Sequence, residues 1–148
     1  MRIVLMAVSM LLSGFVQAQP VSAWADKLCS AASQDSAFGV LVDGLIESGK
    51  VSLQAGEALL SQPCGGQQTV LSRMVNQRQA ENLEYAVIDL GLNLKTAHVE
   101  LQGQQMLLGD ALVRLGQQGD SQTQAFVSDY LDSLEDKDFN PNLRVSLK

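Results

Sequence analysis

The chain has 148 residues, of which 46% are hydrophobic and 18% charged, and its formal net charge is −6. This composition suits one domain with a buried core. Apart from the C-terminal end, no long stretch is poor enough in apolar residues to predict disorder. Because nucleic acid and anionic membrane surfaces both repel an acidic chain, we expect neither as a partner.

The first 18 residues have the pattern of a signal peptide. Arg2 is a short basic region, an apolar run follows at 3–12, and V-Q-A at 16–18 has the small-x-small form of a cleavage site. The apolar run is shorter than the ~20 residues that a membrane-spanning helix needs. We expect cleavage after Ala18 and no membrane insertion of the mature chain, 19–148. The expected location is the periplasm, with release from the cell as the alternative.

The chain has two cysteines, Cys29 and Cys64, which lie 35 positions apart. In an exported protein a structural disulfide between them is the expected state. In the chain-entropy model, closing a loop of this length stabilises the fold by about 3–4 kcal/mol. The alternative is a pair of reactive thiols, but there is no C-x-x-C motif and no adjacent His or Lys pattern to support it.

Apolar residues recur at helical spacing in seven short segments. These segments are residues 21–32, 38–46, 52–60, 70–75, 83–90, 107–115 and 126–134. Gly49, Gly91 and Gly116 follow three of them and are expected to end those helices. No stretch alternates long enough to predict a strand, and only residues 92–101 are ambiguous. The sequence therefore predicts an all-α fold of six or seven short helices.

Six of the seven predicted helical segments form three pairs, each a helix, a polar turn and a second helix. The second and third pairs begin with nearly the same six-residue sequence, GQQTVL at 66–71 and GQQMLL at 103–108. One pair is too small to bury its own apolar face, whereas stacked pairs would bury a continuous core. We therefore predict a single helical-repeat-like domain over residues 19–142, followed by a short C-terminal tail at 143–148.

These pairs resemble ankyrin repeats. Gly66, Thr69 and Leu71 match the opening G-x-T-x-L pattern of a repeat, and Gly91 and Asn93 match its close. The corresponding residues are Leu28, Ala31, Ala32 and 45–49 in the first pair, and Gly103, Leu108, Ala111, Tyr130 and Leu131 in the third. The resemblance implies stacked helical hairpins that recognise a protein. The repeats are longer than the family's ~33 residues, and an irregular helical bundle is the alternative.

A second resemblance rests on LCSAASQD at 28–35 and CGGQ at 64–67. These segments are similar to a family of small exported proteobacterial proteins of unknown function. The resemblance implies a periplasmic location and paired cysteines, and it implies no activity. In a stack of pairs, the Cys29–Cys64 bond would clip the first pair to the second.

The residues that catalysis requires are sparse. His98 is the only histidine, and no G-x-S-x-G motif accompanies it. One histidine and two bonded cysteines do not make a zinc site. The segment DKDFNPN at 136–142 has proline where a calcium loop needs glycine. Glu81, Glu84 and Asp89 are expected on the solvated face of a helix. We therefore expect no enzymatic activity, no cofactor and no metal.

Glutamine is abundant near the predicted turns. The candidate partner-contact residues are Gln67, Gln68, Gln77, Gln79, Gln104, Gln105, Gln117 and Gln118. In a helical stack the turn tips line one edge and often carry the contacts. Uncharged amides there suit a protein partner better than nucleic acid. The alternative is that these glutamines only keep the turns soluble.

Together these features predict an exported, non-enzymatic protein–protein interaction module, an ankyrin-like adaptor. It would use its turn tips and one concave face. Its acidic charge favours a basic partner, because opposite fields speed encounter. The alternative is a holdase chaperone for misfolded envelope proteins or an inhibitor that gives immunity to a toxin. An enzyme with dispersed carboxylates is the third hypothesis.

Overall fold

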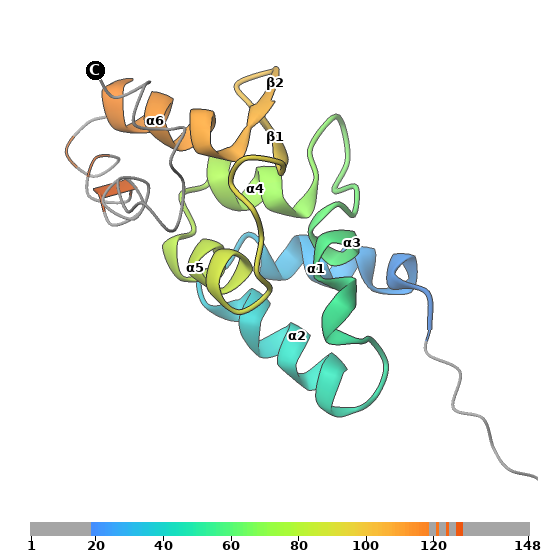
Figure 1. Ribbon diagram of the computed structural model, residues 1–148. Helices are drawn as coiled ribbons and strands as arrows, with labels where there is room; N and C mark the ends of the chain where they lie inside the picture. The colour runs from blue at the N-terminus through green and yellow to red at the C-terminus, as the bar shows by residue number, and fades with distance from the viewer. Residues whose placement is uncertain (1–18, 119–120, 122–123, 125–126, 129–148) are drawn as a thin grey trace, which may run out of the picture.

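The computed structural model describes residues 19–118 together with 121, 124, 127 and 128. Its elements are η1 (Val21–Trp24), α1 (Ala25–Ala31), α2 (Ala37–Glu47), η2 (Leu53–Ala55), α3 (Gly56–Leu60), α4 (Val70–Asn76), α5 (Ala80–Ile88), β1 (His98–Leu101), β2 (Gln104–Leu107) and α6 (Leu108–Gln118). The fold is mostly helical, as predicted (Figure 1). The antiparallel pair β1–β2 corrects the prediction that it is all-α.

The first two helical pairs lie side by side. Within the pairs α1 contacts α2 and α4 contacts α5, and between the pairs α1 contacts α4 and α2 contacts α5. Figure 1 shows α2 and α5 next to each other in the lower half of the view. Gly49 and Gly91 follow the second helix of each pair, both with φ of 67°, so the helix ends predicted there are confirmed. Whether the pairs are ankyrin repeats stays a prediction.

The third predicted pair begins differently. Residues 98–107 form a β-hairpin whose two-residue turn, Gln102-Gly103, has φ values of 52° and 81°. Two positive φ values are what a type I′ hairpin turn requires. The two similar hexapeptides therefore differ in structure. GQQMLL forms a turn, a strand and a helix start, whereas GQQTVL at 66–71 forms a loop and a helix start.

The prediction that the helix over 107–115 ends at Gly116 is wrong, because α6 continues to Gln118. Leu112 and Leu115 are buried on its inner face, and their burial offsets the roughly 1 kcal/mol that one glycine costs a helix. The second helix of the third pair, predicted over 126–134, lies largely outside the described residues. The segment at 136–142 and the predicted tail at 143–148 lie entirely outside them.

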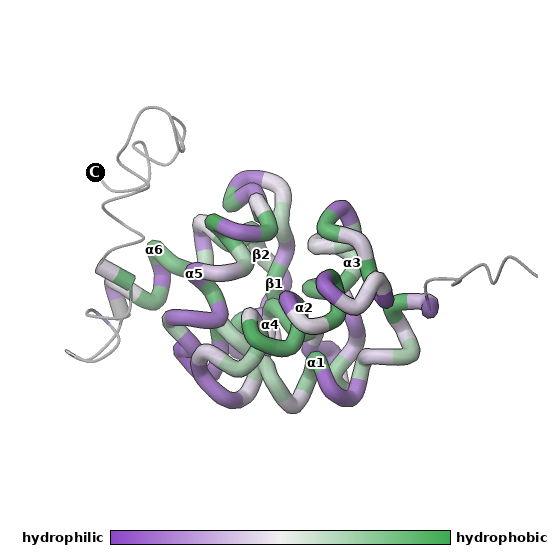
Figure 2. The backbone as a smooth tube through the Cα atoms, turned by 90° about the horizontal axis from the view of Figure 1, so that it is seen from below, coloured by the Kyte–Doolittle hydropathy of each residue, from purple (hydrophilic) through white to green (hydrophobic). Residues whose placement is uncertain are grey.

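The core draws on every predicted stripe before residue 119. Its largest fully buried side chains are Phe38, Leu28, Leu59, Leu60, Met74, Leu83, Leu101, Leu108, Leu112, Val42 and Val70. Hydrophilic stretches lie mostly at the turns around the outside (Figure 2). The periodicity thus predicted which helix faces are buried, and Val127 is also buried.

The turn between α1 and α2 and the start of α5 satisfy each other's backbone groups. The carboxamide of Asn82, fully buried on α5, accepts from the N–H of Phe38 at 3.0 Å. It donates to the carbonyls of Ala31 at 3.1 Å and Gln34 at 2.8 Å. In return Asp35 Oδ1 accepts from the second and third N–H groups of α5, at 2.9 and 3.2 Å. The free N–H groups at the starts of α2 and α5 are thereby capped by side chains that lie about 45 residues away in sequence.

The contact between α2 and α5 depends on a glycine and a tyrosine. A Cβ on Gly39 would stand 2.9 Å from Cδ2 of Tyr85, so glycine allows the ring to lie against α2. The ring meets Phe38 edge-on, with centroids 6.0 Å apart, and its hydroxyl donates to Asp43 Oδ1 at 2.6 Å. Burial, followed by the hydrogen bond to Asp43 and its negative charge, raises the pKa of Tyr85.

The predicted disulfide is confirmed: Cys29 on α1 is bonded to Cys64 in the α3–α4 loop, with Cα atoms 5.4 Å apart. It joins the first helical pair to the segment that leads into the second. Arg73 on α4 reinforces the link, since its guanidinium donates to the carbonyls of Cys29 at 3.2 Å and Cys64 at 2.8 Å. Both cysteines are in this bond, so the structure has no reactive thiol pair.

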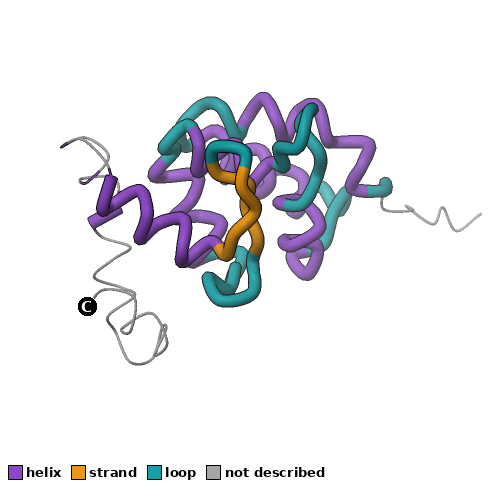
Figure 3. The backbone as a smooth tube through the Cα atoms, turned by 90° about the horizontal axis from the view of Figure 1, so that it is seen from above, coloured by secondary structure: helices purple, strands orange, loops and turns teal. Residues whose placement is uncertain are grey.

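Two side chains of α4 bond to the outer edge of β1, the position that a third strand would occupy in a larger sheet. Ser72 Oγ accepts from the N–H of Glu100 on β1 at 2.8 Å. The carboxamide of Asn76 donates to the carbonyl of Glu100 at 2.7 Å. The hairpin is therefore fixed across the helices (Figure 3), where it forms one wall of the groove described next.

Candidate functional site

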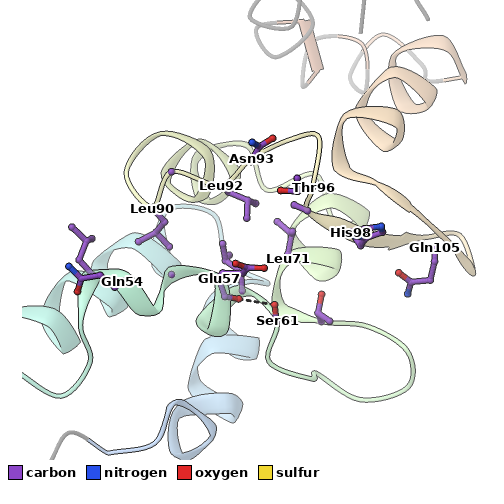
Figure 4. Close-up of a pocket in the computed structure, with 16 residues that line it drawn as sticks. Gln54, Glu57, Ser61, Leu71, Leu90, Leu92, Asn93, Thr96, His98 and Gln105 are labelled. Carbon is purple, nitrogen blue, oxygen red and sulfur yellow. Dashed lines mark hydrogen bonds between the residues drawn. The ribbon is translucent and has the colours of Figure 1, made fainter. Parts of the chain in front are cut away.

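A groove of about 540 Å³ lies between the η2–α3 segment, the α5–β1 connection and the hairpin (Figure 4). Its apolar side chains are Leu53, Leu60, Leu71, Leu90, Leu92 and Ala97. Its polar side chains are Gln54, Glu57, Ser61, Thr69, Asn93, Thr96, His98 and Gln105. The groove thus combines an apolar floor with a rim of amides and hydroxyls.

Local sequence builds the two long walls. Gly56 opens α3 and lets α5 approach, because a Cβ there would stand 3.2 Å from the Cβ of Leu90. Gly91, with a φ of 67°, turns the chain out of α5. Asn93 then closes the next turn, since its side-chain oxygen accepts from the N–H of Lys95 at 2.8 Å. These turns hold the α5–β1 connection opposite α3.

The polar groups of the groove suit hydrogen bonding more than catalysis. Glu57 is the one carboxylate in the lining, and its backbone carbonyl accepts from Ser61 Oγ at 2.7 Å. Thr69 Oγ1 is occupied as the N-cap of α4, where it accepts from the N–H of Ser72 at 3.1 Å. His98 is exposed on the rim. Among the described residues, no group of three His, Cys, Asp or Glu could hold a metal ion.

Beside the groove, β2 has an open edge in the described part of the chain. The sheet has two strands, and Gln105 stands opposite Glu100. The backbone N–H and C=O of Glu100 bond to α4, away from β2. By the alternation of an antiparallel ladder, the N–H and C=O of Gln105 point to the outer edge of β2. The side chain of Gln105 lines the groove, so an edge that can take another strand adjoins the apolar floor.

The structure distributes the predicted glutamines over several places. Gln67 and Gln68 lie before α4, Gln77 and Gln79 after it, Gln104 and Gln105 on β2, and Gln117 and Gln118 at the end of α6. The first two pairs are therefore at opposite ends of α4 and do not share one edge. Among the glutamine side chains that the structure describes, Gln79 donates to the carbonyl of Ser33 and Gln104 accepts from Arg114. Of the eight, Gln105 lines the groove.

The apolar floor was not recognised from the sequence. Leu53 precedes α3 and is 53% exposed, and Leu92 follows the glycine that ends α5. The sequence placed Leu53 in the predicted helical segment 52–60 and Leu92 in an ambiguous stretch, and neither position signalled a shared surface. Such residues are candidates for a surface site when they cannot join the core.

Comparison with known proteins adds no family. No family model matches this chain, and neither does a curated protein or a solved structure. Within the described residues, no helix has the length and hydropathy of a membrane span.

Proposed function

We propose that the protein is a non-enzymatic binding module that holds an extended segment of another protein in this groove. The observation that carries the proposal is the apolar floor under an almost uncharged polar rim. Apolar side chains of a peptide would fill the floor, and amides and hydroxyls would bind its main chain. The open edge of β2 supports an extended partner, because such edges bind peptides through main-chain hydrogen bonds.

The proposal includes export and action in the periplasm after removal of residues 1–18. The Cys29–Cys64 bond supports it, because disulfides persist in oxidising compartments and are rare where thiols are kept reduced. It also includes a degenerate ankyrin-like stack. The support for this part is that α1–α2 and α4–α5 lie side by side.

Site-specific photo-crosslinking in the cells that make the protein tests the proposal. A photoreactive residue is placed at Thr96 on the groove rim or, as the control, at Asp110 on α6; both positions are exposed. We expect one dominant adduct from position 96 and none of that size from position 110. Equal adducts from both positions would contradict binding in the groove. Many adducts of different size from position 96 would favour the holdase alternative.

A pair of matched variants sharpens the test. Leu53→Glu puts a carboxylate on the groove floor, and Val40→Glu makes a similar change on the outer face of α2. Both side chains are largely exposed, at 53% and 75%, so neither substitution should unfold the domain. We expect Leu53→Glu to abolish the adduct from position 96 and Val40→Glu to preserve it.

A further inference from the structure

The outward faces of α2 and α5 form a second surface, which includes two of the most exposed large hydrophobic residues. Val40 on α2 is 75% exposed and Ile88 on α5 is 63% exposed. Their neighbours Val42 and Val87, on the inner faces of the same helices, are 0% and 4% exposed. Each helix is thus apolar on its inner face and also carries one large apolar residue outward.

Five carboxylates surround these two residues. Asp43 and Glu47 share the outward face of α2 with Val40, at spacings of three and seven residues. Glu81 and Glu84 share the outward face of α5 with Ile88, and Asp89 follows at the end of that helix. All five residues are exposed, and neither helix contains a lysine or an arginine. Among the described residues none of the five forms an ion pair, so the negative charge is not compensated within the surface.

The two helices are held in fixed positions. The hydrogen bond from Tyr85 to Asp43 and the fit of Gly39 against the Tyr85 ring join them in the middle. Asn82 and Asp35 tie the start of α5 to the turn before α2. A surface built on rigid elements loses little conformational entropy on binding, so this one is preorganised for a partner.

We propose that this acidic–apolar face, defined by Val40, Asp43, Glu47, Glu81, Glu84 and Ile88, binds a lysine- or arginine-bearing amphipathic segment of a second protein. Apolar side chains of the partner would cover the two exposed hydrophobic residues, and its cations would pair with the carboxylates. Charge complementarity selects this occupant. A second copy of the chain is disfavoured, because a symmetric contact would bring the same carboxylates together. None of the six residues lines the groove, so this surface is separate from the proposed peptide site.

Binding of a defined peptide to the purified, disulfide-bonded protein tests the inference. The probe is a fluorescent 18-residue amphipathic helix of leucine and lysine, and its control has glutamate in place of lysine. We expect the lysine peptide to bind in one-to-one stoichiometry and the glutamate peptide not to bind. Raising the salt concentration from 50 to 300 mM should weaken binding several-fold, because surface charges are screened.

Three double variants locate the binding surface. Glu47→Lys with Glu84→Lys should weaken the lysine peptide about tenfold or more. The control pair, Asp26→Lys with Asp110→Lys, makes the same change in net charge at exposed positions outside both surfaces and should leave affinity within twofold. Val40→Ser with Ile88→Ser keeps the charges and should also weaken binding about tenfold.

Two results would overturn the inference. If the control pair weakens binding as much as Glu47→Lys with Glu84→Lys does, the peptide responds to net charge and not to this surface. If the variant with Val40→Ser and Ile88→Ser binds the peptide normally, the two hydrophobic residues do not contribute to binding and the face is an ordinary solvated surface. Leu53→Glu, which tests the groove, should not affect this peptide, so failure of the groove and failure of this face are distinguishable.

Discussion

Replacing Asn82 by alanine should strongly destabilise the domain, because one carboxamide serves the ends of two helices. The substitution leaves the N–H of Phe38 without a partner in buried surroundings. The carbonyls of Ala31 and Gln34 each lose one of two hydrogen bonds, because each also accepts from a backbone N–H. A buried polar group left unpaired costs about 1–3 kcal/mol. Water can also reach Gln34, which is exposed, so the unpaired N–H of Phe38 makes the largest contribution. Together with the lost hydrogen bond to Ala31, we expect a loss of about 2–3 kcal/mol in the free energy of unfolding.

The assay is urea unfolding of the oxidised protein, followed by the fluorescence of Trp24, the only tryptophan, which is buried in the core. The matched control is Asn93→Ala, which deletes the same carboxamide at an exposed turn with a single local hydrogen bond. The control should lose about 1 kcal/mol or less. A loss below about 1 kcal/mol for Asn82→Ala, or one equal to that of Asn93→Ala, would refute the capping argument.

Three further predictions concern stability. Removing the disulfide as the Cys29→Ser/Cys64→Ser variant should cost about 3–4 kcal/mol by denaturant unfolding, and an unchanged midpoint would contradict its structural role. Gly39→Ala should cost about 1–3 kcal/mol because its Cβ meets the Tyr85 ring. Gly44→Ala on the same helix, with nothing within 4 Å, should gain about 0.5–1 kcal/mol in the same melts; equal effects would exclude the clash. Because the folded-state pKa of Tyr85 lies above its ordinary value of about 10, its stabilising contribution is complete below pH 10 and is lost as pH rises further. Unfolding measured from pH 9 to 12 should show a shallower decline for Tyr85→Phe than for wild type, and parallel curves would rule this out.

Helical periodicity predicted the first two pairs well because burial decides their structure. Leu28, Val42 and Leu83 each belong to a stripe of apolar residues at helical spacing, and each is fully buried. The turn glycines Gly49 and Gly91 were equally informative, since their positive φ favours glycine. Local patterns of this kind do not depend on distant residues.

The hairpin could not be predicted in the same way. Its strands are four residues each, too short for alternation to be distinguished from a helical stripe. Its first turn residue is Gln102, which has a positive φ of 52° without being glycine, asparagine or aspartate. What fixes the hairpin is its attachment to Ser72 and Asn76 on α4, more than 20 residues earlier. Tertiary contacts thus outweigh the local signal.

The groove was missed for a related reason. Leu53 in η2 and Leu92 after α5 are about 40 residues apart, and they line the same groove because α3 packs beside the end of α5. The glutamine pattern pointed to the turns, but turn position does not determine which turns share a surface. The pairing of Cys29 with Cys64 was predicted correctly because a chain with two cysteines has one possible intramolecular pairing.

The most direct test of the central claim is calorimetric titration of the partner segment identified by crosslinking, prepared as a peptide. Wild-type protein, Leu53→Glu and Val40→Glu are compared in the same buffer. We expect one-to-one binding to wild type and to Val40→Glu, and at least a tenfold loss of affinity for Leu53→Glu, because a carboxylate would be buried under apolar side chains. Equal affinity of the peptide for all three proteins would contradict the groove as the binding site.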